Sequence, residues 1–115
     1  MPLSSHIPEL SALEVLLTVA RTGSLNSAAR EIGVSQQAVS ARIRTIESQT
    51  GVTLLNRSAH GSSLTAGGIV IAEWAARLLD VAAELDAGIA ALRHDRHHRL
   101  RDAAARLLRR PQSAI

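Results

Sequence analysis

Apolar residues in the middle of the chain recur with a helical period. Within residues 36–49, Val39, Ile43 and Ile46 are separated by steps of four and three, so on a helix they share one face. That face must be buried, because the other positions of the segment are mostly polar. Ser35 is a suitable N-cap, and Gly51 stands just past the last helical position. The pattern predicts a helix over residues 36–49.

A first helix is predicted over residues 11–22, after an N-terminal arm at residues 1–9 that we expect to be frayed. Ser11 and Glu14 have the spacing of a capping box, in which each side chain satisfies an amide at the start of the helix. Its core-facing residues are expected to be Leu13, Leu16, Leu17 and Ala20.

A short second helix is predicted over residues 27–32. Gly23 can end the first helix in the left-handed conformation, Ser24 or Asn26 can cap the second, and Gly33 breaks it. A short helix, a turn and a longer helix with a polar face have the spacing of a helix-turn-helix, which places its second helix in the DNA major groove.

Two short strands are expected next, at residues 52–55 and 63–64, around a turn at residues 59–62. Thr65 then has the position of an N-cap for a long helix over residues 66–93. The apolar residues of that helix step by three and four for three heptads. At 1.5 Å per residue such a helix is roughly 40 Å long, more than the small domain can cover, so a partner helix is favoured. The residues of this apolar stripe are Ile71, Trp74, Leu78, Val81, Leu85, Gly88 and Leu92.

The polar face of the 36–49 helix has side chains suited to reading bases. Gln36, Gln37, Ser40 and Arg44 lie along it, with Arg42 beside it. Glutamine can make a bidentate contact with adenine, arginine contacts guanine or phosphate, and serine contacts either base type. A solvated outer face is the competing interpretation, since amphipathic helices are common in soluble proteins.

A family resemblance favours the DNA interpretation. The chain resembles the LysR-type transcriptional regulators over about residues 10–92, in the helix-turn-helix and in the wing that follows it. The matching residues are Gly23-Ser24, Ala28-Ala29, Ser35-Gln36, Ala38, Ser40, Ile43, Glu47, Gly51, Leu54-Leu55, Arg57, Gly61, Leu64-Thr65 and Gly68. The resemblance implies that Arg57 and His60 in the wing contact the DNA backbone or minor groove. It also implies that the long helix pairs with that of a second subunit, and that an effector-binding domain, for which this chain has no counterpart, would follow.

Several positions depart from the family pattern. Gln37 replaces the usual proline, Leu16 and Leu55 replace phenylalanine, Ala41 replaces a frequent arginine, and His60 replaces another basic residue. Exchanging one apolar residue for another preserves the core. The absence of the family's arginine at position 41 removes a positive charge, and we expect this to affect which bases are read.

Composition and charge narrow the function classes. The chain has one Trp, no Tyr and no Phe, so it lacks the aromatic platforms that bind single-stranded nucleic acid or RNA. It has no Cys, which excludes disulfides and thiolate metal sites. The net charge of +3 is uneven, with a positive helix-turn-helix, an acidic 66–93 segment and a strongly basic tail. No targeting or membrane-spanning segment is expected, and we expect a cytoplasmic protein.

The tail at residues 94–115 has helical spacing and is rich in Arg and His, so it could be a basic amphipathic helix that ends at Pro111. Three origins stay open: a longer regulator cut after the linker, a naturally short regulator, or a frameshifted remnant. His94 and His98 are one turn apart, as zinc or nickel ligands can be, but the surrounding arginines disfavour a cation and we expect no metal.

We therefore expect a mainly α protein with a winged helix-turn-helix at residues 1–65, a dimerisation helix at 66–93 and a basic extension at 94–115. It should bind double-stranded DNA sequence-specifically, as a homodimer on a pseudo-palindromic site, with no cofactor, catalysis or membrane partner. The alternatives are an interaction module that heterodimerises with a full-length regulator through the long helix, and a basic nucleic-acid or membrane-surface tail on a vestigial domain. The expected DNA-contacting residues are Ser35, Gln36, Gln37, Ser40, Arg42, Arg44, Arg57 and His60, and the expected dimer contacts are Ile71, Trp74, Leu78, Val81, Leu85 and Leu92.

Overall fold

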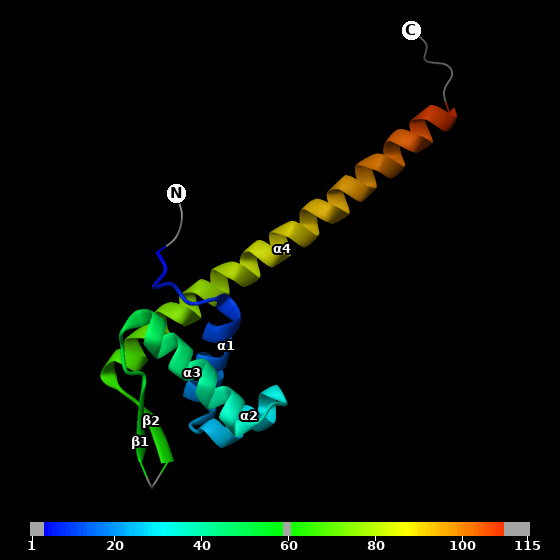
Figure 1. The fold of residues 1–115 in the computed structure, drawn as a ribbon. Coiled ribbons are helices and arrows are strands. Elements are labelled where there is room, and N and C mark those ends of the chain that lie inside the picture. Colours follow the sequence, from blue (N-terminus) through cyan, green and yellow to red (C-terminus); the bar gives the residue numbers. More distant parts are fainter. Residues whose placement is uncertain (1–3, 59–60, 110–115) are drawn as a thin grey trace. The chain divides into compact units, whose positions relative to one another are not determined.

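The computed structural model describes residues 4–58 and 61–109. Three helices, α1 (Leu10–Thr22), α2 (Leu25–Ile32) and α3 (Gln36–Thr50), are followed by strands β1 (Leu55–Ser58) and β2 (Gly61–Leu64) and by helix α4 (Ala66–Arg109) (Figure 1). One compact unit ends at Asp80 and a second begins at Val81. The expected mainly α fold with a winged helix-turn-helix is confirmed. No helix in the described part of the chain has the length and apolar character to cross a membrane.

The helix-turn-helix is delimited by side-chain caps and left-handed residues. Ser24 Oγ accepts from the Ser27 amide (3.0 Å) and Ser35 Oγ accepts from the Ala38 amide (3.1 Å), as two of the predicted caps require. Gly33 ends α2 at φ +85° and Gly51 ends α3 at φ +72°, a region that favours glycine. Because Ser24 is the cap, α2 begins at Leu25, two residues before the predicted start.

The predicted capping box of the first helix is wrong. The N-cap is Glu9, which makes no side-chain capping bond, and Ser11 already lies inside α1. The expectation of a frayed arm is also wrong for the described residues before α1. The Ile7 amide donates to the Ser4 carbonyl (3.1 Å), and His6 Nδ1 donates to the Gln49 carbonyl at the end of α3 (2.9 Å).

The core lies where α1, α2 and α3 meet, and it extends to Leu54 and the start of α4. The predicted stripe of α3 is fully buried, as are Leu13 and Leu16 of α1. Leu17 is only half-buried, and Ala20 is exposed, so its assignment to the core was wrong. Val15 and Val19 are buried instead of Ala20. The buried face of α1 is therefore centred on Leu16 and on the residues one helical turn from it.

The first strand lies three residues later than predicted, and the second begins two residues earlier than predicted. β1 and β2, here called the wing, pair antiparallel with Leu55 opposite Leu64 and Arg57 opposite Ser62. Residues 52–54 are outside the ladder, and the amides of Leu54 and Leu55 instead donate to Glu47 Oε2 of α3 (2.8 and 3.4 Å). The connection at residues 59–60, which includes His60, lies outside the described residues.

Helix α4 begins at the predicted cap. The Gly68 amide donates to Thr65 Oγ1 (2.9 Å), and the Thr65 amide donates to the Leu54 carbonyl (2.9 Å). The predicted end at Arg93 is wrong, since α4 continues to Arg109 and includes most of the basic extension. A run of Ala, Leu and Arg, all good helix formers, sustains it.

Candidate nucleic-acid interface

The exposed face of α3 is fixed by its buried stripe. Since Val39 and Ile43 face the core, positions about a quarter turn or more away are directed outward. Gln36 and Gln37 are exposed in the first turn, Ser40 is half-buried in the second, and Arg44 is exposed in the third.

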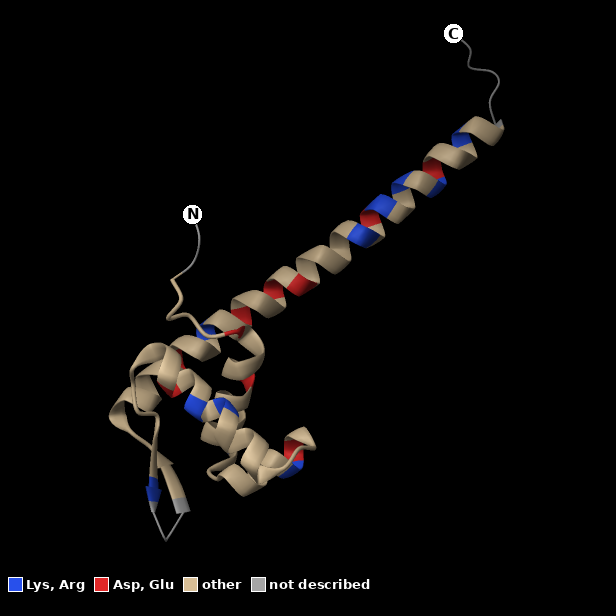
Figure 2. Ribbon diagram, in the orientation of Figure 1, with Lys and Arg blue, Asp and Glu red and all other residues tan. Residues whose placement is uncertain are grey.

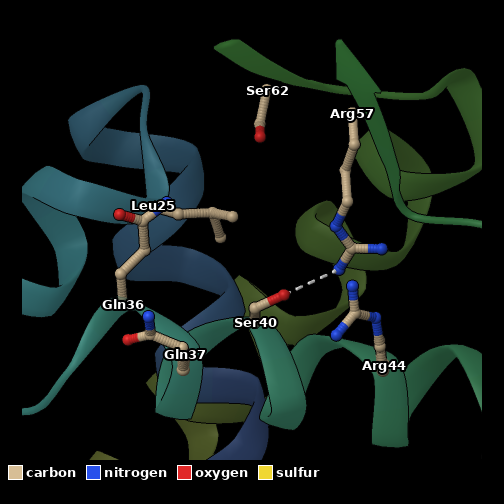
Figure 3. Close-up of a pocket in the computed structure, with 7 residues that line it drawn as sticks. All are labelled: Leu25, Gln36, Gln37, Ser40, Arg44, Arg57 and Ser62. Carbon is tan, nitrogen blue, oxygen red and sulfur yellow. Dashed lines mark hydrogen bonds between the residues drawn. The ribbon is translucent and has the colours of Figure 1, made fainter. Parts of the chain in front are cut away.

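These side chains line a groove between α3 and the wing, with a volume of about 430 Å³. Figure 3 shows the two glutamines at one end, next to Leu25, and Arg57 reaching from β1 toward α3. Arg57 Nη2 donates to Ser40 Oγ at the outer limit of a hydrogen bond (3.5 Å). We call this the α3–wing groove; its lining residues are Leu25, Gln36, Gln37, Ser40, Arg44, Arg57 and Ser62.

Glu47 positions the wing against α3. One carboxylate oxygen accepts from the amides of Leu54 and Leu55, and the other lies 3.6 Å from Arg57 Nη1. The Glu47 side chain is 17% exposed and that of Arg57 31%, so the pair is partly screened from water. The Glu47 side chain thus holds both the start of β1 and the guanidinium of Arg57, and Arg57 lies beside Ser40.

Not every predicted contact lies in the groove. Ser35 is engaged as the cap of α3, and its exposed hydroxyl stands beside the groove rather than in its lining. Arg42 is two residues from Arg44, about 200° around the helix, and lines a separate hollow with Glu9 and Ser11 of the α1 side. Arg42 is exposed but does not line the α3–wing groove, so its expected DNA contact stays a prediction.

Two groove residues were missed by sequence reasoning. Leu25 begins α2 and its side chain is buried, and Ser62 is brought opposite Arg57 by the strand register. Glu47 was noted only as part of the family pattern. Glu47 is the one acidic residue of α3 and lies at the edge of the buried stripe. This position was the signal in the sequence that could have identified it as a contact to the wing.

The electrostatics of the groove favour an anion. Two arginines and no acidic residue line it, and Figure 2 shows basic positions on α3 and β1. On α4, the acidic residues before Arg93 give way to the arginines of the basic extension. Among the described residues, no group of three or more His, Asp or Glu side chains is arranged to hold a metal ion.

Comparison with known proteins agrees with this geometry. Residues 10–69 match the family described as bacterial regulatory helix-turn-helix protein, lysR family. The chain belongs to the LysR family of transcriptional regulators. It is thus a DNA-binding regulator domain of LysR type, and the family is one of regulators rather than enzymes.

Individual relatives share both the sequence and the fold. The chain is 52% identical over 108 residues to an HTH-type transcriptional regulator of Mycobacterium tuberculosis, covering 94% of this chain and 35% of that protein. It is 35% identical to the DNA-binding domain of CbnR in a crystal structure with DNA, with a TM-score of 0.69 over 74% of this chain and 99% of that one. Full-length CbnR bound to its target DNA matches with the same TM-score at 33% identity, over 73% of this chain and 29% of that one.

The LysR-family chain therefore spans about a third of the length of the curated relatives it matches. A match of 108 residues in a chain of 115 must extend through at least Leu108. The match therefore includes most of the basic extension.

The predicted dimer contacts are mostly exposed in the single chain. Ile71 is half-buried and packs against the domain core, whereas Trp74 is 58% exposed and Leu78 44%. In the second unit Val81, Leu85 and Leu92 are exposed, each by 60% or more. Ile89, which the predicted stripe passed over in favour of Gly88, is exposed as well.

Proposed function

We propose that this LysR-family chain reads double-stranded DNA with α3 in the major groove and the wing against the backbone or minor groove. The observation that carries the proposal is the α3–wing groove, where Gln36, Gln37, Ser40 and Arg44 converge with Arg57. The glutamines would contact adenine edges, and the arginines guanine or phosphate. We propose that Ser35 and Arg42, which lie outside the groove lining, contact phosphate. For His60 we propose the contact with the DNA backbone or minor groove that the family resemblance implies.

The DNA-bound relatives support this assignment. The CbnR DNA-binding domain, whose structure was determined with DNA, has the same fold over most of this chain. Because the fold is shared, we propose that α3 of this chain can enter the DNA major groove, which is about 12 Å wide.

We propose further that the chain acts as a homodimer on a pseudo-palindromic site. Large apolar side chains of α4 are exposed in the single chain, and exposed apolar residues at helical spacing are typical of an interface. They are Trp74, Leu78, Val81, Leu85, Ile89 and Leu92. A two-fold dimer would present two copies of α3 to two half-sites, spaced by about one turn of DNA or a multiple of it.

The test is a binding measurement on the purified chain. Duplexes selected from a random pool by this protein are compared with scrambled duplexes of equal length, by fluorescence anisotropy at several salt concentrations. We expect the selected sequence to bind at least about 10³-fold more tightly and to contain an inverted repeat. Equal affinity for both duplexes at every salt concentration would exclude sequence-specific reading.

A second candidate is an interaction module that pairs through α4 with a longer regulator. It is favoured by the same exposed apolar residues of α4. This candidate predicts that DNA binding by a longer relative falls as the chain is added, while the chain alone binds no selected duplex.

A further inference from the structure

The three histidines of the basic extension lie on one face of α4, together with an arginine. Counted from the first histidine, the others follow after three, four and seven residues, and a helix brings these positions within about 100° of arc. All four side chains are exposed. The rings of His94 and His98 are stacked, with centroids 6.1 Å apart and planes inclined by 22°. We call this the His–Arg face; its residues are His94, His97, His98 and Arg101.

The His–Arg face lies opposite the apolar stripe of α4. Nine residues separate Leu92 from Arg101, which places the two side chains about 180° apart around the helix. His94 is about 160° from Leu92 in the same sense. The described part of the unit that begins at Val81 consists of α4 alone. The His–Arg face therefore stays open to a ligand whether or not the apolar stripe is covered.

The charge around this face favours an anionic ligand. Residues 93–108 have five arginines and two aspartates, a net charge of +3 before any histidine is protonated. Asp95 is already paired with Arg99 one turn later (2.7 Å), so its carboxylate is partly neutralised. Figure 2 shows the basic positions at this end of α4. The charged residues within one turn of a histidine of the face are Arg93, Asp95, Arg101 and Asp102.

A phosphate backbone suits these side chains. Arginine and protonated histidine donate charge-assisted hydrogen bonds to phosphate oxygens, and arginine can present two donors as a fork. From His94 to Arg101 the face extends about 10 Å along the helix, and a DNA duplex carries one charge per about 1.7 Å of its axis. About six phosphates therefore lie within reach of four donor side chains. A metal ion is disfavoured, because Arg101 adds a positive charge to the same face.

We propose that the His–Arg face is a second DNA-contacting site, which binds the phosphate backbone of duplex DNA without regard to sequence and more tightly as the pH falls. Histidine changes charge between about pH 5 and about pH 8, and a neighbouring phosphate favours the charged form. Binding at this face then takes up protons, so the affinity rises as the pH falls through that range. The inference rests on DNA as the ligand of this family, and not on which bases α3 reads or on a dimer.

The test compares the full chain with a variant that carries His94→Gln, His97→Gln and His98→Gln. Affinity for a scrambled duplex is measured by fluorescence anisotropy over a salt series, at about pH 7.5 and at about pH 5.5. Each phosphate contact contributes about 0.9 to the slope of log affinity against log salt. On lowering the pH, we expect the wild-type slope to steepen by about two units more than that of the variant. His6 and His60 are present in both chains, so the difference reports the His–Arg face.

A single arginine variant tests the same face without its histidines. Arg101→Gln should reduce the slope by about one unit at both pH values, because arginine stays charged throughout. Arg96→Gln removes the same charge about 140° away around the helix, outside the face, and should change the slope by less than about half a unit. Circular dichroism verifies that the variants keep α4. Equal losses for the two arginine variants would show that only net charge matters and would overturn the proposed face.

Failure of this site and failure of base reading are distinguishable. The ratio of affinities for the selected and scrambled duplexes tests α3, and the histidine changes should leave that ratio unchanged. Equal slopes for the wild type and the histidine variant at both pH values would overturn the proposal while leaving base reading untouched. If those slopes are equal and the wild type alone binds phosphatidylserine-containing vesicles at the lower pH, the face belongs to a lipid surface and the DNA assignment is wrong.

Discussion

Gln36 has the position of a base-reading residue, exposed in the first turn of α3 and at one end of the α3–wing groove. Replacing it by alanine should weaken binding to the selected duplex by about 1–3 kcal/mol at one base position, because a bidentate contact with adenine is lost. Binding to random DNA should be nearly unchanged. Gln49→Ala, at the far end of α3 and outside the groove, is the matched control. Equal losses on selected and random DNA would remove Gln36 from base reading.

Arg57 is expected to act through charge rather than through base identity. Arg57→Gln should weaken binding to all sequences and reduce the slope of log affinity against log salt by about one unit, as the loss of one phosphate contact requires. Arg21→Gln is the control, since Arg21 pairs with Glu31 and does not line the groove. Fluorescence anisotropy over a salt series measures both slopes, and an unchanged slope for Arg57→Gln would show that no phosphate is contacted.

The positions of these two residues could be predicted to different extents. Gln36, Gln37, Ser40 and Arg44 follow from helical spacing alone, because a buried stripe determines which residues face outward. The convergence of Arg57 with Ser40 depends on contacts between segments seventeen residues apart, which spacing does not encode.

Glu47 provides the sharpest test of how that convergence is maintained. Glu47→Ala removes the acceptor of the Leu54 and Leu55 amides and should lower the free energy of unfolding by about 1–3 kcal/mol. Glu47→Gln keeps an acceptor oxygen and should lose less. Urea unfolding followed by circular dichroism measures both, and identical midpoints for Glu47→Ala and wild type would show that the carboxylate does not hold the wing.

Among the elements, the helices were predicted more accurately than the strands. Ser35, Gly33 and Gly51 are local signals that act within a few residues, and they mark the ends of α2 and α3 correctly. The strands have four residues each and no sustained alternation. Their start depends on Glu47, which takes the amides of Leu54 and Leu55, so the ladder begins later than the apolar pattern suggested.

The junction between the wing and α4 depends on close packing at Gly68. A Cβ atom there would clash with the Leu54 carbonyl oxygen, a backbone atom that cannot move cheaply. Gly68→Ala should therefore lower the free energy of unfolding by about 1–3 kcal/mol. Gly88→Ala is the matched control, because it lies in the same helix with open space around it and should raise stability by about 0.5–1 kcal/mol. Thermal unfolding of both variants tests this prediction. A Gly68→Ala variant that is stabilised as much as Gly88→Ala would show that Gly68 is not closely packed against Leu54.

At the scale of the whole molecule, the sequence predicted an apolar stripe on the long helix and helical spacing in the tail, but not that the two segments form one continuous helix, α4. The boundary at Arg93 was drawn where the composition turns basic, whereas helix propensity continues unchanged to Arg109. Charge and helical period are independent properties of a segment.

Dimerisation through α4 is tested by placing a charge in the apolar stripe. Leu78→Asp should convert the dimer to a monomer and abolish tight binding to a site with two half-sites, because a buried unpaired carboxylate costs several kcal/mol. Ala83→Asp adds the same charge at an exposed position nearly half a turn from Leu78 around the helix, and should leave the dimer intact. Light scattering gives the mass and circular dichroism verifies the fold. If Leu78→Asp stays folded and dimeric at the wild-type concentration, the interface lies elsewhere, and the two copies of α3 must be brought to DNA by other contacts.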